Sequence, residues 1–267
     1  MSFGSLFAGI GGFDLGLERA GMTCAWQVER EPYAVRVLEK HWPNVRRHDD
    51  VCTFPPEEGN WEVDLICGGF PCQDISCAGK GAGLAGERSG LWHEMHRIIG
   101  ELRPRFVIVE NVAALLSRGM ETVLGELTEI GYDAEWHVIP ACAVGAPHRR
   151  DRVWIVAFNA DREHDNQERK VSRELCANTS RVRAHVADTD RAGREKQRRP
   201  EPESTQHAAA ELSGWWETEP AMGRVVDGLP HRVDRLRGLG NAVVPQIVEL
   251  IGRAITESLG GPAGGRE

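Results

Sequence analysis

Short apolar runs alternate with helix-length amphipathic stretches through residue 158, and this alternation limits the folds open to the chain. The apolar runs have the length of buried strands, which we predict at 4–7, 24–29, 63–67, 106–110 and 153–158. Helical periodicity lies between them, at 13–20, 33–41, 91–102 and 120–130. Such alternation predicts parallel strands joined by crossover helices, that is, a doubly wound, mostly parallel α/β sheet.

The alternation stops near Asn159. From there to about residue 213 the sequence is charged and poor in large apolar residues, and helical periodicity returns only at 246–259, after a proline suited to a first helical turn. We therefore predict one domain built from 1–158 and 239–267, with a small irregular insertion at 159–238. An unstructured linker over 160–213 is the alternative, because this segment can bury little apolar surface.

Composition and cysteine spacing exclude several classes of protein. Hydrophobic residues make up 41% and charged residues 27%, which is ordinary globular composition and excludes collagen-like, coiled-coil and disordered chains. No apolar run approaches the roughly 20 residues of a membrane span, and the first residues do not read as a signal peptide. Seven cysteines without a Cys-x-x-Cys pair argue against a disulfide framework or a zinc site. We expect a cytoplasmic protein with no metal and no membrane contact.

The charge distribution permits a nucleic-acid partner without indicating one. The net charge of −8 argues against such a partner when taken alone. However, the basic residues of 149–237 are nearly all Arg, which pairs bidentately with phosphates and guanine edges. An acidic protein can therefore still have a basic working face.

The first motif is the glycine-rich segment 7–12, between the first predicted strand and helix. Its glycines allow a ligand to approach the backbone at a helix N-terminus. Glu29 ends the second strand, where an acidic side chain binds ribose hydroxyls in dinucleotide folds. Asp14 interrupts the Gly-x-Gly-x-x-Gly pattern. The motif indicates an adenosine-type cofactor, does not separate NAD from S-adenosylmethionine, and leaves a simple tight turn as the alternative.

The second motif, Gly-Gly-Phe-Pro-Cys72-Gln, directly follows the strand 63–67. Ligands of open α/β sheets bind beyond the carboxyl ends of the strands, so Cys72 is expected at the functional edge. A buried, inert thiol is the commoner fate of a cysteine, but here Gly-Gly and Pro fix a loop that aims it. A nucleophilic Cys72 needs a cationic or acid–base neighbour to favour the thiolate.

Two further motifs lie at strand ends. The apolar strand 106–110 ends in Glu110-Asn111, and a carboxylate in this place faces a ligand more often than not; a helix N-cap at Asn111 is the alternative. In the segment 148–152, residues two apart on a strand share a face, so Arg150 and Arg152 are predicted to point together. A solvated charge run is the alternative for this segment.

These four motifs, in this order, resemble the DNA cytosine-5 methyltransferases. Shorter matches follow at 88–92 and 240–245, so the resemblance covers roughly 1–158 and 224–259. It implies an S-adenosylmethionine-dependent enzyme of Rossmann-like fold that acts on duplex DNA, with 159–238 as its target-recognition region. The sequence departs from the family at His148, where Gln is common, and before the Gly-Asn loop, where the usual element is not recognisable.

The resemblance assigns a role to each matched residue. Cys72 matches the nucleophile, Glu110 the acid that holds the base, and Arg150 and Arg152 the pair around the target cytosine. The positions that match cofactor contacts are Phe7, Gly9, Gly11, Glu29, Asp50, Val51, Leu91 and Asn241, with Asp50 and Val51 at the adenine and Leu91 and Asn241 near the methionine part.

The chemistry explains these residue types. Carbon-5 of cytosine is too weak a nucleophile until a thiolate adds at carbon-6, and this requires a base flipped out of the duplex. We expect the glycine-rich stretch 73–89 to close over that base, and a recognition site of about four base pairs, because few residues are available to contact base edges. A cognate restriction endonuclease is a further expected partner, and we expect a monomer of prokaryotic or phage origin. An RNA cytosine-5 methyltransferase, a catalytically silent DNA-binding relative and a nicotinamide oxidoreductase are the alternatives.

Overall fold

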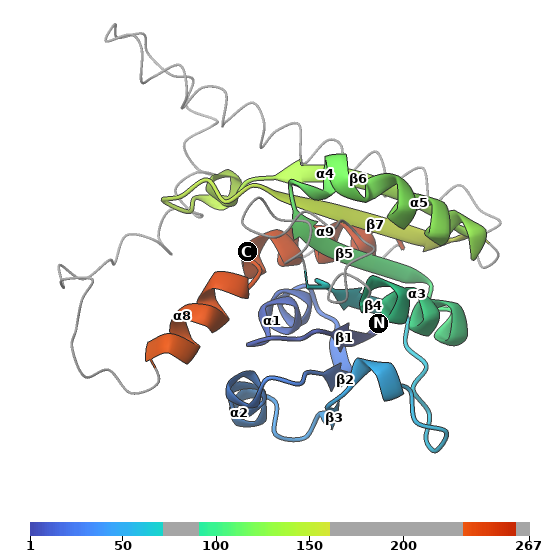
Figure 1. The fold of residues 1–267 in the computed structure, drawn as a ribbon, viewed down its shortest axis with the longest axis horizontal. Helices are drawn as coiled ribbons and strands as arrows, with labels where there is room; N and C mark the ends of the chain where they lie inside the picture. The colour runs from blue at the N-terminus through green and yellow to red at the C-terminus, as the bar shows by residue number, and fades with distance from the viewer. Residues whose placement is uncertain (72–90, 161–231, 260–267) are drawn as a thin grey trace, which may run out of the picture.

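The computed structural model describes residues 1–71, 91–160 and 232–259, whose strands form one seven-stranded sheet (Figure 1). The strand order is β3-β2-β1-β4-β5-β7-β6. The first five strands in this order run parallel to one another, whereas β7 runs antiparallel to both of its neighbours, β5 and β6. The strands span Ser2–Leu6 (β1), Thr23–Val28 (β2), Arg46–His48 (β3), Leu65–Gly68 (β4), Phe106–Val112 (β5), Tyr132–Ile139 (β6) and Arg152–Asn159 (β7).

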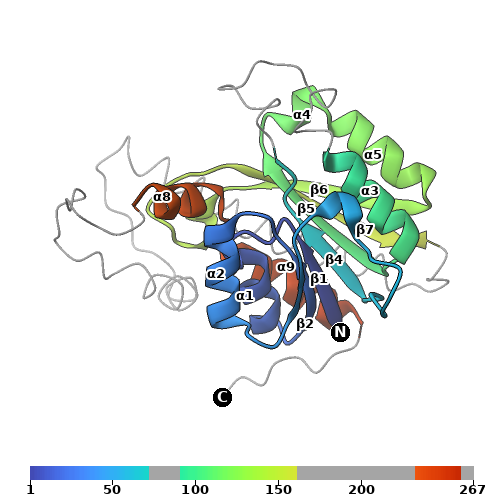
Figure 2. The same cartoon turned by 60° about the horizontal axis from the view of Figure 1, so that its bottom comes forward.

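Helices connect the strands and cover both faces of the sheet (Figure 2). They span Gly12–Arg19 (α1), Pro32–His41 (α2), Leu91–Leu102 (α3), Leu115–Arg118 (α4), Met120–Glu129 (α5), Arg232–Asn241 (α8) and Pro245–Ser258 (α9), with short 3-10 turns at Val51–Thr53 (η1) and Ala141–Val144 (η3). None of the helices in the described part of the chain is long and apolar enough to cross a membrane.

Two core layers follow from the alternation of side chains along each strand, because successive residues of a strand point to opposite faces. On β5, Val107 and Val109 pack into the layer that contains the buried residues of α3 and α5. Phe106 and Ile108 pack into the opposite layer, with α1 and α9. Burial on both faces explains why this strand reads as a continuous apolar run in the sequence.

The C-terminal helices belong to the same body as the N-terminal ones. Leu17 of α1 and Ile251 of α9 are fully buried in one core layer, and α8 packs against α2. The predicted division between 238 and 239 falls inside α8, which packs with α9 against the main domain. The division itself stays a prediction, because 161–231 lie outside the described residues.

The structure confirms the predicted α/β class and the mostly parallel sheet. Each predicted strand and helix is present, with ends within two residues of the predicted ones. The sequence did not predict β3 and β6. Strand β3 has only three residues, all polar, and β6 is an edge strand that carries Asp133 and Glu135 among its half-exposed residues, so neither has the apolar run of a buried strand.

Candidate active site

A cavity of about 730 Å³ lies at the carboxyl ends of the parallel strands, and most of the predicted site residues line it. Ten of the twelve predicted positions line it: Phe7, Gly9, Glu29, Asp50, Val51, Leu91, Glu110, Arg150, Arg152 and Asn241. The other two differ. Gly11 does not line the cavity, and Cys72 lies outside the described residues, as does the predicted closing loop 73–89.

The loop after β1 is shaped by left-handed backbone and held by Glu29. Phe7 has a φ of 53° and Gly9 a φ of 56°, and such a conformation at a bulky residue like Phe7 is typical of a functional loop. The N–H of Gly9 donates to Oε2 of Glu29 at 2.7 Å, and the N–H of Glu31 donates to Oε1 at 2.7 Å. Glu29 therefore ties this loop to the start of α2, in addition to lining the cavity.

Gly11 serves helix packing and does not line the cavity, and its predicted contact with the cofactor stays a prediction. It caps α1 with a φ of 85°, a left-handed conformation that favours glycine. A Cβ atom at this position would overlap the ring of Trp42 at the end of α2. Asp14 is also remote from the cavity, because it is fully buried under the sheet and accepts hydrogen bonds from Ser5 and Gln27.

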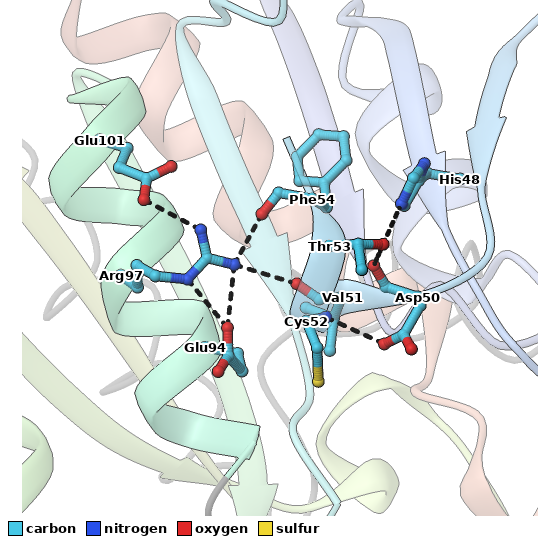
Figure 3. Close-up of polar contacts among 9 residues, drawn as sticks. All are labelled: His48, Asp50, Val51, Cys52, Thr53, Phe54, Glu94, Arg97 and Glu101. Carbon is cyan, nitrogen blue, oxygen red and sulfur yellow. Dashed lines mark hydrogen bonds and ion pairs between the residues drawn. The ribbon is translucent and has the colours of Figure 1, made fainter. Parts of the chain in front are cut away.

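The turn at Asp50 also lines the cavity, and Figure 3 shows its polar contacts. Oδ1 of Asp50 accepts the N–H of Cys52 at 3.0 Å and caps η1. Hydrogen bonding to Cys52 lowers the pKa of Asp50, which keeps the carboxylate ionised. Asp50 and Val51 therefore present an anionic acceptor and an apolar side chain side by side.

Glu110 is the buried acid of the site. It is 8% exposed, on β5, and its Oε1 lies 2.9 Å from Nε of Arg152. Burial raises its pKa from 4.5 to about 7, although Arg152 and Arg150 act in the opposite direction. An acid with this pKa is populated in both protonation states at neutral pH, which suits a group that donates and accepts protons.

Arg150 and Arg152 both line the cavity, but not as two residues of one strand. Strand β7 begins only at Arg152, and Arg150 precedes it with a left-handed φ of 39°, so the predicted shared strand face is wrong. Nη2 of Arg150 donates to the carbonyl oxygens of Gly240 and Ala242, each at 2.8 Å. Arg150 therefore holds the two carbonyls that flank Asn241, while Arg152 faces Glu110.

The segment that leads to Cys72 runs across Glu110. Asn111 donates from Nδ2 to the carbonyl of Phe70 at 3.2 Å, and a Cβ at Gly69 would lie 3.0 Å from Oε2 of Glu110. Glycine at 69 thus permits the close approach of the loop to the acid. Asn111 lies within β5, so the helix N-cap alternative is wrong. The described part of this loop ends at Pro71, one residue before Cys72.

Helix α8 contributes cavity residues that the sequence did not predict. Arg237 lines the cavity and its Nη1 lies 3.5 Å from Oε2 of Glu31, while Gly238 packs against Ile10 and Tyr33. Glycine is unfavourable inside a helix, and α8 has few buried apolar positions, so its sequence does not read as helical. The Gly240-Asn241 motif, which forms the end of α8, is the one signal that could have indicated it.

Comparison with known proteins then decides the family. A sequence model described as "C-5 cytosine-specific DNA methylase" matches residues 1–218. The chain belongs to the C-5 cytosine-specific DNA methylase family. The membership confirms the resemblance carried by the four motifs.

Two curated relatives are bacterial. The chain is 37% identical over 161 residues to Type II methyltransferase M2.BsuMI of Bacillus subtilis (strain 168), a match that covers 57% of this chain and 41% of that protein. It is 33% identical over 165 residues to Type II methyltransferase M.HhaI of Haemophilus parahaemolyticus, covering 60% of this chain and 50% of that protein. The chain therefore spans half or less of the length of these relatives.

Solved structures share the fold. The chain resembles the Entamoeba histolytica methyltransferase EhMeth with a TM-score of 0.61 and 13% identity, over 97% of this chain and 98% of that one. At this identity the likeness shows the fold alone, and it extends over nearly the whole chain.

Proposed function

We propose that this protein transfers a methyl group from S-adenosyl-L-methionine to carbon-5 of a cytosine flipped out of duplex DNA, through a covalent adduct with Cys72. One observation carries the proposal: the buried pair of Glu110 and Arg152 opens into the same cavity as the Phe7–Gly9 loop, Glu29 and Asp50. Groups suited to a nucleobase and groups suited to an adenosine-type cofactor thus share one space.

The cavity residues fit S-adenosyl-L-methionine by their chemistry. Asp50 offers an ionised acceptor for an amino group, and Glu29 offers carboxylate lone pairs for ribose hydroxyls. Phe7 and Val51 offer apolar contact for a purine, and Leu91 offers it for the methionine part. A volume of about 730 Å³ is in the range of cofactor sites. When bound, the cofactor supplies an activated methyl group.

Glu110 and Arg152 are suited to hold a cytosine. The N3 atom of cytosine is an acceptor, so it is bound by the protonated form of Glu110, which a pKa of about 7 makes available at neutral pH. Arg152 orients the carboxyl group and can donate to the O2 oxygen. Both contacts strengthen as negative charge develops on the ring, which is the requirement for catalysis.

The proposed reaction proceeds through a covalent intermediate, in which Cys72 and carbon-5 of the base have separate roles. The Cys72 thiolate forms a bond to carbon-6, and the electron pair of the 5,6 double bond makes carbon-5 nucleophilic. Carbon-5 takes the methyl group, and the S–CH3 bond breaks to release S-adenosylhomocysteine. Carbon-5 then gives its proton to a water molecule, and the electron pair of that C–H bond restores the 5,6 double bond and expels the Cys72 thiolate. Glu110 is nine-tenths buried, so a cytosine reaches it only after leaving the base stack.

The test uses purified full-length protein, S-adenosylmethionine with a radioactive methyl group and three acceptors: unmodified duplex DNA, tRNA and no nucleic acid. We expect label in duplex DNA only, at cytosines that base-resolution sequencing identifies, and none with Cys72→Ser. Label in tRNA would favour the RNA methyltransferase alternative. DNA binding without label would favour the catalytically silent alternative.

DNA recognition is assigned to 159–238 from the order of motifs along the chain. Grafting 159–223 into a relative of known specificity, followed by methylome sequencing, should change the methylated site. A chimaera that keeps its original site would overturn this assignment. The relatives' names as Type II methyltransferases support our further expectation of a partner endonuclease that cuts the same site; we also expect the methylase to act as a monomer.

A further inference from the structure

Arg97 of α3 holds the turn that carries Asp50 and Val51 (Figure 3). Its Nη2 donates to the carbonyl oxygens of Val51 at 3.2 Å and of Phe54 at 2.7 Å. Its Nε donates to Glu94 and its Nη1 to Glu101, each at 2.9 Å. One guanidinium therefore joins α3 to both ends of the turn.

The turn needs such a partner because it is a single 3-10 turn. The last carbonyls of a helical segment have no partners within the segment, and they favour a cation. The backbone closes the turn with two bonds, from the N–H of Thr53 to the carbonyl of Asp50 at 3.1 Å and from the N–H of Phe54 to the carbonyl of Val51 at 3.3 Å. Arg97 adds a charged donor from α3 to the carbonyls of Val51 and Phe54, at the end of the turn that its own backbone does not satisfy beyond these bonds.

Glu94 and Glu101 fix the direction of the guanidinium. They lie three residues before and four residues after Arg97 on α3, the spacings at which side chains meet on one helix face. With two edges of the guanidinium held by α3, the remaining N–H groups point at η1. The contact is thus defined by the helix, and it is not an incidental surface pair.

The two sides of the turn have different surroundings. Phe54 is fully buried, with its ring 4.6 Å from that of Trp26 and 5.0 Å from that of Trp61. Asp50 and Val51 line the cavity, whereas Arg97 does not. Arg97 and Phe54 therefore anchor the turn from behind, and the anchored turn presents Asp50 and Val51 to the ligand space.

We propose that Arg97 is a positioning residue for the adenine-binding part of the cofactor site. It acts through the Asp50–Val51 turn and does not touch the ligand. The inference rests on the proposed function, in which the adenine of S-adenosylmethionine lies against this turn. It adds α3, which also supplies Leu91 to the cavity, to the elements that set cofactor affinity.

The test compares Arg97→Ala and Arg97→Lys with Arg253→Ala by titration calorimetry with S-adenosylhomocysteine, without DNA. Arg253 pairs with Glu249 on α9 at 2.7 Å, so it controls for the loss of a helix-surface ion pair. We expect about a tenfold weaker affinity for Arg97→Ala, corresponding to the loss of two hydrogen bonds to the turn. We expect a partial loss for Arg97→Lys and none for Arg253→Ala.

Two further readouts separate positioning from a general structural role. In methyl transfer, Arg97→Ala should raise KM for S-adenosylmethionine while kcat at saturation stays within about twofold, since Arg97 is remote from the reacting atoms. The substitution Arg97→Ala should also weaken the binding of S-inosylhomocysteine less than that of S-adenosylhomocysteine, because S-inosylhomocysteine has a carbonyl in place of the 6-amino group of adenine.

Several outcomes would overturn the proposal. Unchanged affinity in folded Arg97→Ala would do so, as would equal losses for the two ligands. If Arg97→Ala does not fold, two other variants replace it: Arg97→Lys, and the double variant that combines Glu94→Gln with Glu101→Gln. Wild-type affinity in both of these variants would also overturn the proposal. A wild-type protein that binds neither ligand would instead overturn the proposed function.

Discussion

The carboxylate of Glu110 and the guanidinium of Arg152 form a buried pair between β5 and β7, with 2.9 Å between Oε1 and Nε. A cation at this distance usually keeps a carboxyl group ionised. Here burial dominates and raises the pKa of Glu110 to about 7. The pair therefore retains an exchangeable proton at neutral pH, where an exposed pair would not.

This raised pKa should appear in stability as a function of pH. The folded state keeps the proton of Glu110 to about pH 7, while an unfolded glutamate loses it near 4.5, so folding loses stability as pH rises between these values. Glu110→Gln keeps a neutral side chain, so its free energy of unfolding should rise relative to that of wild type by up to about 3 kcal/mol across that range, at about 1.4 kcal/mol per pKa unit. Urea unfolding from pH 4.5 to 8 measures this difference, with Glu121→Gln, at an exposed position of α5, as the control. Parallel plots of unfolding free energy against pH for wild type and Glu110→Gln would contradict the prediction.

The same substitution should separate catalysis from DNA binding. Glutamine preserves the shape of Glu110 and can donate an N–H, but it cannot transfer a proton to N3 as charge develops. We expect turnover to fall by roughly 10²- to 10⁴-fold, the usual contribution of a general acid. DNA affinity, measured by fluorescence anisotropy, should stay within about twofold. Wild-type turnover in this variant would show that N3 is bound by another group.

The two arginines of the 148–152 segment should have separable effects. Arg150→Ala removes both hydrogen bonds to the carbonyls beside Asn241, so it should weaken S-adenosylhomocysteine binding about three- to tenfold even without DNA. Arg152→Ala should leave that affinity unchanged, because Arg152 faces Glu110. Calorimetry on both variants tests this prediction. If Arg150→Ala bound S-adenosylhomocysteine as tightly as Arg152→Ala and wild type, Arg150 would act only on DNA.

These two arginines also show where prediction from sequence ended. Spacing along the chain predicted that Arg150 and Arg152 reach one site, and both line the cavity. It did not predict their partners, because the left-handed backbone at Arg150 turns its side chain towards residues ninety positions away. Strand periodicity carries no information about such a contact.

The elements of the parallel half of the sheet were predictable for a simple reason. A strand buried on both faces, such as β5, needs apolar residues on both faces, and this leaves the continuous run 106–109 in the sequence. Edge strand β6 needs only a few apolar residues, so it leaves no such run. The role of Arg97 depends on its contact with η1, which only the fold reveals. Contacts between distant segments, rather than local pattern, define that part of the site.

Cys72 should be the residue that attacks the base. Duplex DNA containing 5-fluorocytosine should trap wild-type protein as a covalent adduct stable to denaturation, because fluorine cannot leave as a cation in the elimination step. Cys72→Ser should form no adduct, since a serine hydroxyl is scarcely ionised at neutral pH. Cys142→Ser serves as a control thiol variant. An adduct in Cys72→Ser, located by peptide mass spectrometry, would assign the nucleophile to another cysteine.

Glu29 should matter for cofactor binding through both of its oxygens. Each oxygen accepts a backbone N–H at 2.7 Å, from Gly9 and from Glu31, so the carboxylate shapes the loop as well as lining the cavity. Glu29→Ala should weaken S-adenosylhomocysteine binding by about 10- to 100-fold, or roughly 1.4–2.7 kcal/mol. Glu29→Gln should be nearly as harmful, because its amide NH₂ must face one of the two N–H donors.

Glu31→Gln is the matched control for this prediction. Its side chain is 45% exposed and 3.5 Å from Arg237 at the edge of the same cavity, and exposed pairs of this kind contribute little. We expect its affinity for S-adenosylhomocysteine to stay within about threefold of wild type. Calorimetry together with thermal unfolding separates loss of affinity from loss of fold. Near-wild-type binding by Glu29→Gln would mean that one accepting oxygen is sufficient, and that the loop does not depend on the second bond.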